Sequence, residues 1–174
     1  MKQSQWPMDG NDIYNDCAAV AAADLIELWT GVAPSKEDVM AAWEAVTGQT
    51  PKGTDPGPDT NELAFLDYWR DIGVAGHRII DFYTIKHLPA ATALRNLKKY
   101  NGLYVMLALK RDCENKEVWA SIDGPDIGNH FVAAVDAERN GVICISWGKP
   151  RLITWPFWRA QVKTCVVCEK ENKS

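Results

Sequence analysis

Residues 10–26 read GNDIYNDCAAVAAADLI, a polar loop that runs directly into an alanine-rich segment. This change predicts a helix that begins at Cys17 and ends at Gly31, because a mostly apolar segment extends up to that glycine. Small residues on nearly every side indicate a helix buried against other backbone. Asp16 is expected to cap it, with its carboxylate accepting hydrogen bonds from the amides of the first turn.

Cys17 occupies the position in this helix where a thiol is most readily activated. Free N–H groups and the positive end of the helix dipole favour the thiolate there and lower the pKa from its free value of roughly 8.5. The adjacent carboxylate of Asp16 opposes that shift, so a nearby imidazolium is needed to stabilise the anion. The alternative interpretation is an inert, buried cysteine, which is the commoner role of this residue type.

Composition limits the classes of protein to consider. With 174 residues, 47% hydrophobic and 24% charged, the chain is expected to form one domain over residues 1–174. A net charge of -4 and a pI near 5.4 give no electrostatic footprint for nucleic acid. We find no apolar run near the roughly 20 residues of a membrane span and no apolar signal core at the start. These observations predict a cytoplasmic protein.

The cysteines argue against a disulfide framework, because an odd number in a chain of this size favours a reducing compartment. Cys165 and Cys168 have CxxC spacing, but they lie in a β-branched stretch where positions three apart point to opposite faces of a strand. We therefore predict no metal site there, and no cofactor. The five cysteines are Cys17, Cys113, Cys144, Cys165 and Cys168.

The hydrophobic period changes along the chain and predicts an α+β fold, with a helical part over about 10–73 and a mostly antiparallel sheet over about 76–170. The Gly/Pro-rich loop 49–58 is long enough to be a lid or rim. Helices are expected at 17–30, 35–47, 59–72, 89–100 and around 154–158, and strands at 77–85, 103–109, 118–122, 130–135, 142–148 and 164–169.

His130 is expected at the start of an apolar strand, at the end of the loop 121–129. Asn140-Gly141 is a strong hairpin signal that links this strand to the next. A tight turn there places Arg151 opposite His130 and Ser146 on the other face of the sheet. A longer loop would instead shift the register and bring Ser146 to His130. Two alternatives remain: a backbone carbonyl or a water orients the ring, or the dyad is incomplete.

Cys17 and His130, together with an amide six residues before the cysteine, resemble the papain-like cysteine peptidases, and more closely their small bacteriocin-leader-peptidase type. In that superfamily the cysteine begins the central helix, the histidine begins a strand of the C-terminal sheet, and a loop amide, usually glutamine, stands where this chain has Asn11. The sequence Ser-Trp-Gly at 146–148 follows in the order expected of the family. The resemblance implies that Cys17 is the nucleophile, His130 the base and Asn11 a donor in the oxyanion hole.

The third catalytic position departs from the family pattern. Ile145 stands where the orienting asparagine is expected, just before Ser-Trp-Gly, which leaves Ser146 as a candidate orienter of the imidazole. Asp136 shares the strand face of His130 but lies about 20 Å away along the strand. His77 and His87 are expected in structural positions at element starts.

The resemblance implies a thiol hydrolase that cleaves a peptide or other amide bond through a covalent thioester, with a peptide or protein as its partner. One alternative is a catalytically silent papain-like module that binds a peptide or protein. Another is an amidase of cell-wall peptide, which uses the same dyad. The Gly-Asn-Asp and Asp-Cys elements are also similar to small proteins of phages and bacteria, so a virion-associated product is a further alternative to a cytoplasmic one.

Overall fold

The computed structural model describes residues 6–85 and 89–171, so His87 lies outside the described residues. It confirms an α+β fold in which three helices precede the sheet. The elements are α1 (Cys17–Thr30), α2 (Lys36–Thr47), α3 (Glu62–Asp71), β1 (Ile79–Thr84), α4 (Ala90–Tyr100), β2 (Leu103–Lys110), a 3-10 turn η1 (Arg111–Cys113), β3 (Val118–Trp119), β4 (Asp126–Glu138), β5 (Gly141–Ser146), β6 (Lys149–Thr154), α5 (Trp155–Gln161) and β7 (Val162–Lys170).

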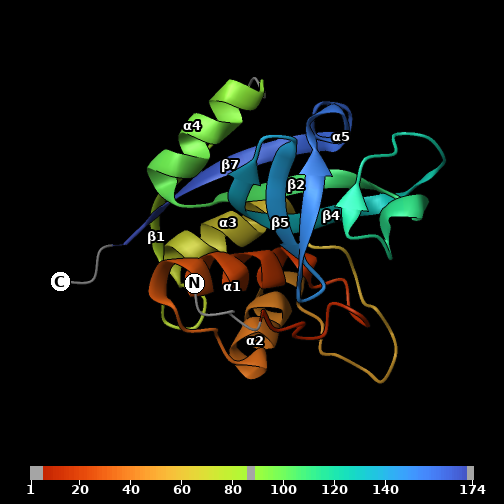
Figure 1. Ribbon diagram of the computed structural model, residues 1–174. Coiled ribbons are helices and arrows are strands. Elements are labelled where there is room, and N and C mark those ends of the chain that lie inside the picture. The colour runs from red at the N-terminus through yellow and green to blue at the C-terminus, as the bar shows by residue number, and fades with distance from the viewer. Residues whose placement is uncertain (1–5, 86–88, 172–174) are drawn as a thin grey trace.

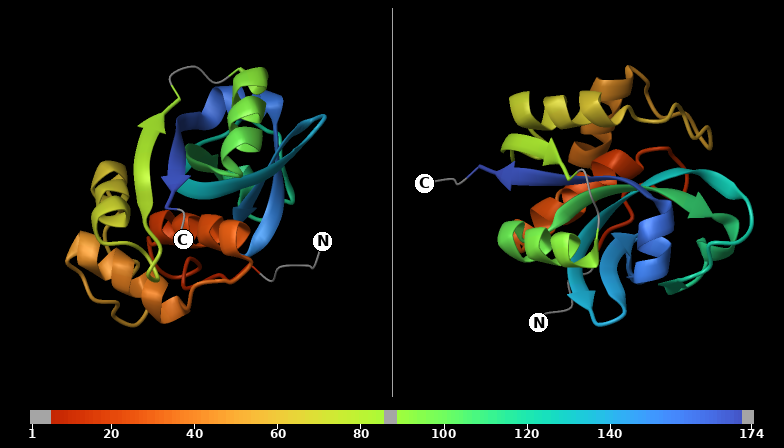
Figure 2. Two further views of the ribbon diagram at one scale, coloured as in Figure 1. Left: turned by 90° about the vertical axis from the view of Figure 1, so that its left-hand side faces the viewer. Right: turned by 90° about the horizontal axis from the view of Figure 1, so that it is seen from above.

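The strands form one seven-stranded sheet in the order β1-β7-β2-β4-β5-β6-β3. Neighbours are antiparallel except β3 and β6, which are parallel. Helices α1 to α3 lie on one side of the sheet, and α4 and α5 lie on the other (Figures 1 and 2). The central strand β2 is therefore buried on both faces, which is why it reads as a nearly continuous apolar run.

Helix α1 packs closely on the sheet, as its alanines predicted. The hydroxyl of Tyr104 in β2 donates a hydrogen bond of 3.1 Å to the carbonyl of Ala18. Just before β2, Gly102 has φ +127, and a Cβ there would lie 2.6 Å from Leu25 Cδ2. Only glycine permits this approach between the helix and the turn that enters β2. The first turn of α1 is thereby held against the middle of the sheet.

The structure corrects several predicted boundaries. Strand β4 begins at Asp126, so His130 lies within the strand and not at its start. The polar and glycine-rich sequence before His130 predicted a loop. Instead, Gly128 and Asn129 pair with β2, which supplies the backbone hydrogen bonds that a loop would lack. Strand β6 was not predicted. The cap of α3 is Asn61, which accepts from the Ala64 N–H, so this helix begins at Glu62 and not at residue 59.

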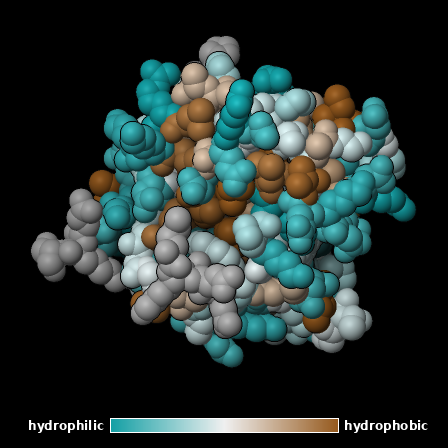
Figure 3. Space-filling model, viewed as in Figure 1, coloured by the Kyte–Doolittle hydropathy of each residue, from teal (hydrophilic) through white to brown (hydrophobic). Residues whose placement is uncertain are grey.

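The protein has two apolar cores, one on each face of the sheet, and a more polar outer surface. On the face shown in Figure 3, hydrophilic residues cover most of the area and hydrophobic residues gather near the middle.

Four tryptophans are fully buried: Trp43, Trp69, Trp119 and Trp158. Trp43 and Trp69 pack in the core beneath α1 to α3, and the partly buried Trp29 packs against it. None of the helices in the described residues is long and apolar enough to cross a bilayer.

Candidate active site

The polar loop before α1 is fixed by a second loop, 49–58. The side-chain amide of Asn15 donates to the carbonyl of Gly57 at 2.7 Å, and its backbone N–H donates to the carbonyl of Pro56 at 2.8 Å. The hydroxyl of Tyr14 donates to the carbonyl of Gly53 at 3.0 Å. Loop 49–58 thus supports the chain that enters α1. Asn15 uses its side-chain amide for this contact between the two loops.

Asp16 does not cap α1 through its carboxylate, which corrects the prediction. Its backbone carbonyl accepts from the N–H groups of Ala19 and Val20, but neither carboxyl oxygen has a hydrogen-bond partner among the described residues. The side chain is 0% exposed. Burial, followed by the charge of Asp9, raises the pKa of Asp16 to about 8. The carboxyl is therefore mainly protonated at pH 7 and does not carry the charge that the sequence assigned to it.

Cys17 is the first residue of α1 and is half-buried. Burial raises the pKa of its thiol to about 12; the backbone N–H of Phe131 opposes this, and the charges of Asp16 and Asp59 add to it. The predicted lowering of the pKa is therefore wrong, because loss of hydration outweighs the helix N-terminus. The contact with Phe131 places the sulfur beside β4, next to the residue that follows His130.

His130 is 5% exposed and its ring Nε2 lies 2.7 Å from Ser146 Oγ. The structure thus brings together the base and the candidate orienter named from the sequence. Burial lowers the pKa of His130 to about 4, so the imidazole is neutral at pH 7. Both the thiol and the imidazole are therefore uncharged in the resting protein.

A β-bulge explains why Ser146 reaches His130 when the tight-turn prediction placed it on the other face. The hairpin turns at residues 139–140, because Glu138 pairs with Gly141, and the register then shifts between Ala134 and Asp136. One extra residue in a strand reverses which side chains share a face. Arg151 pairs with Cys144 and not with His130, which corrects the predicted register.

Aromatic rings enclose the imidazole. Trp147 stacks on His130 with ring centroids 4.6 Å apart and an angle of 18°, and Trp119 lies 6.3 Å away at 52°. Trp147 adopts φ +49 and Gly148 φ +67, the paired left-handed conformation of a two-residue hairpin turn between β5 and β6. A bulky residue rarely adopts this conformation. The turn holds the indole over the histidine.

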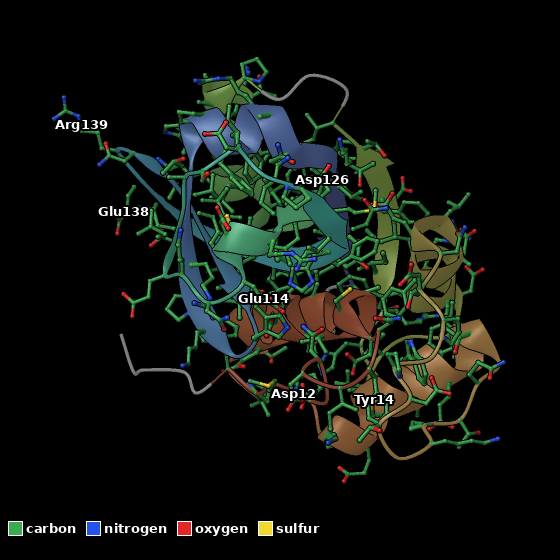
Figure 4. The ribbon with its side chains drawn as sticks, turned by 90° about the vertical axis from the view of Figure 1, so that its right-hand side faces the viewer. Asp12, Tyr14, Glu114, Asp126, Glu138 and Arg139 are labelled. Carbon is green, nitrogen blue, oxygen red and sulfur yellow. The ribbon has the colours of Figure 1, made fainter. Side chains whose placement is uncertain are left out.

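Asn11 joins the two halves of the site. Its backbone carbonyl accepts a hydrogen bond of 3.1 Å from Trp147 Nε1, and its buried side chain lines a cavity of about 450 Å³. The cavity lies between the loop before α1, the residues after η1 and the β5–β6 turn. Figure 4 shows Asp12 and Tyr14 on its lower side and Glu114 above them. Its lining residues are Met8, Asn11, Asp12, Ile13, Tyr14, Asn15, Glu114, Asn115, Trp147, Lys149 and Arg151.

Two solved structures share this architecture. A cysteine protease from Carica candamarcensis, solved in complex with E-64, superposes with a TM-score of 0.65 at 13% identity, over 92% of this chain and 91% of its own. This chain has a papain-like fold. A procathepsin B from Trypanosoma congolense superposes with a TM-score of 0.59 at 11% identity, over 91% of this chain and 69% of its own. No family model and no curated protein sequence matches the chain.

The papain-like fold leaves the other cysteines in structural positions. Cys165 and Cys168 are buried in β7, one in the core beneath α4 and α5 and the other in the core beneath α1 to α3. The predicted opposite facing of the CxxC pair is therefore confirmed. In the part of the chain that the structure describes, no three histidine, cysteine or acidic side chains form a group suited to a metal ion.

Proposed function

We propose that this protein is a thiol hydrolase that cleaves a peptide or other amide bond, with Cys17 as nucleophile and His130 as base. The observation that carries the proposal is the hydrogen bond of 2.7 Å between His130 Nε2 and Ser146 Oγ beneath the stacked ring of Trp147. A buried histidine oriented by a hydroxyl and an indole, with a cysteine sulfur against the next backbone N–H of the same strand, is suited to nucleophilic catalysis.

The chemistry follows from the neutral resting state. With its proton on Nε2, the imidazole donates to Ser146 and keeps Nδ1 as an acceptor. As the sulfur attacks the carbonyl carbon, the thiol proton passes to Nδ1 and the oxyanion receives hydrogen bonds from the Cys17 backbone N–H and the Asn11 side-chain amide. The C–N bond breaks as His130 protonates the leaving amine, giving a thioester. Water, deprotonated by His130, then releases the acid and restores the thiol.

The proposal is tested by the pH dependence of alkylation at Cys17. Iodoacetamide is applied between pH 4.5 and 9, and the modified cysteines are located by mass spectrometry of peptides. With proton transfer to a neutral imidazole, we expect a rate at Cys17 that changes little above about pH 5, since burial lowers the pKa of His130 to about 4. A thiol without a base, whose pKa is about 12, would instead react about tenfold faster for each pH unit.

A matched pair of variants separates chemistry from packing. Cys17→Ala should abolish hydrolysis of a mixed peptide library and leave thermal unfolding nearly unchanged, because the side chain is half-buried. Cys113→Ala, at a cysteine that is 1% exposed, should lower the unfolding temperature and keep hydrolysis. Hydrolysis that survives Cys17→Ala contradicts the assignment of the nucleophile.

The silent binding module is the second candidate, and the burial of both reacting groups favours it. If Cys17 alkylation rises tenfold per pH unit and no library peptide is cleaved, the module is the better description of the protein. A cell-wall peptide amidase is distinguished within the hydrolase class by adding purified peptidoglycan peptides to the same library.

A further inference from the structure

The cavity beside Asn11 contains a buried cation without a matching anion. Arg151 is 7% exposed and lines the cavity. Its Nη1 donates to the carbonyl of Lys116 at 2.9 Å, while Nε has no hydrogen-bond partner among the described residues. None of the ion pairs between described residues includes Arg151. A buried guanidinium whose Nε–H has no acceptor is costly unless an anion completes its hydrogen bonds.

A carboxylate is the anion that this arrangement fits. The guanidinium fork presents parallel donors to two carboxylate oxygens. Lys149 lines the same cavity and adds a second cation. Asp12 and Glu114 also line it, and like Lys149 they are exposed, so water screens all three charges more than that of Arg151. A volume of about 450 Å³ is in the range of sites for small ligands, about 300–1,000 Å³.

Two residues of the proposed site line the cavity, and Cys17 and His130 are not among its lining residues. Trp147 lines it and stacks on His130, the group that protonates that amine in the proposed reaction. Asn11, the proposed oxyanion donor, lines it as well. A substrate whose carbonyl meets Cys17 would therefore extend its leaving group past the indole and toward Arg151.

We propose that Arg151, assisted by Lys149, binds a carboxylate on the leaving-group side of the scissile amide. The assignment of the side depends on the proposed hydrolase function. The carboxylate is either the C-terminus of a short leaving segment or an acidic side chain within it, since the two present the same oxygens to the guanidinium.

Peptide binding to the Cys17→Ala protein tests the inference without requiring hydrolysis. The probes are acetyl-Ala-Ala-Ala with a free carboxylate, the same peptide as its C-terminal amide, and acetyl-Ala-Glu-Ala-amide, each titrated by calorimetry. The free carboxylate should bind at least about tenfold more tightly than the amide, as expected for charge-assisted hydrogen bonds. Comparable affinity of the glutamate peptide would assign the site to an acidic side chain; weak binding of it would assign the site to the C-terminus.

Charge variants test whether Arg151 is responsible for the preference for a carboxylate. Arg151→Gln should remove the difference between carboxylate and amide, and Arg151→Lys, which keeps a cation but loses the fork, should retain part of it even if the glutamine variant is unstable. Arg139→Gln is the matched control, because Arg139 lies at the tip of the β4–β5 hairpin, far from the cavity (Figure 4). Equal affinity of the two alanine peptides, no measurable binding of either at millimolar concentration, or an unchanged preference in the Arg151 variants would overturn the inference. Failure of the hydrolase proposal would appear separately, in the alkylation of Cys17.

Discussion

The two sides of the candidate active site differ in how their buried polar groups are surrounded. On the sheet side, His130 has a hydroxyl at 2.7 Å and a stacked indole. On the helix side, Asp16 is fully buried beside Cys17, and neither of its carboxyl oxygens has a partner among the described residues. The sheet side therefore holds its imidazole through specific contacts, whereas the helix side keeps its acid neutral by excluding water.

The two groups also give opposite pH dependences of stability. The pKa of His130 falls from 6.5 to about 4 on folding, so its contribution is complete above about pH 6.5 and is lost as the pH falls toward 4. The pKa of Asp16 rises from 3.8 to about 8, so its contribution is complete below about pH 3.8 and is lost as the pH rises through 8. Stability is thus limited by the sheet side in acid and by the helix side in base.

The largest effect is expected from His130→Gln, which removes the proposed base on the sheet side. Turnover of a cleaved library peptide should fall by about 10²–10⁴, as is typical when a positioned general base is lost. The pH-independent part of Cys17 alkylation should disappear with it. Steady-state kinetics and alkylation at pH 6 and 8 measure both. A variant that keeps its rate would show that the sheet side takes no part in the chemistry.

Asn11→Ala tests whether the helix side stabilises the developing charge. Losing one oxyanion donor typically costs about 10²–10³ in turnover. Asn15→Ala is the control, since that amide holds the Gly57 carbonyl and should affect mainly the melting temperature. Similar losses of turnover in the two variants would mean that the loop conformation, and not a donor at Asn11, is what matters.

Asp16→Asn asks whether the unpartnered acid limits stability in base. Because the amide cannot ionise, the free energy of unfolding at pH 8.5 should increase by about 2–4 kcal/mol relative to the parent, with little change at pH 4. Urea titrations at the two pH values measure this. Asp12→Asn, at an exposed carboxylate, should change neither value. A gain that is equal at both pH values would assign the effect to packing.

Ser146→Ala should give the smallest effect. The ring would lose one hydrogen bond in a buried site, which corresponds to about 1 kcal/mol and roughly a fivefold loss of turnover. Trp147 would still hold the ring plane. An effect as large as that of His130→Gln would make the hydroxyl, and not the indole, the main support of the imidazole. The measurement is kcat together with the unfolding free energy of the same variant.

The local signals in the sequence were sufficient for the helical half. An alanine run ended by Gly31 predicted α1, and Ser35 predicted the start of α2, where its hydroxyl does accept from the Asp38 N–H. Such signals act over a few residues, so they can be read without knowing the fold. The start of β4 was missed because pairing with β2, rather than composition, holds residues 126–129 extended. Strand β6 was missed because its residues are held extended by pairing with β5 and β3.

The sequence by itself determined which residues are available for the chemistry: a cysteine at a helix start, one histidine on a strand, an amide before the helix and a hydroxyl after the strand. Only the tertiary structure decided how they meet. A bulge near Val135 turns Ser146 toward His130, burial reverses the expected pKa of Cys17, and the β5–β6 turn brings Arg151 into a cavity. These outcomes depend on strand register and on exclusion of water, which arise from contacts between segments far apart in the chain.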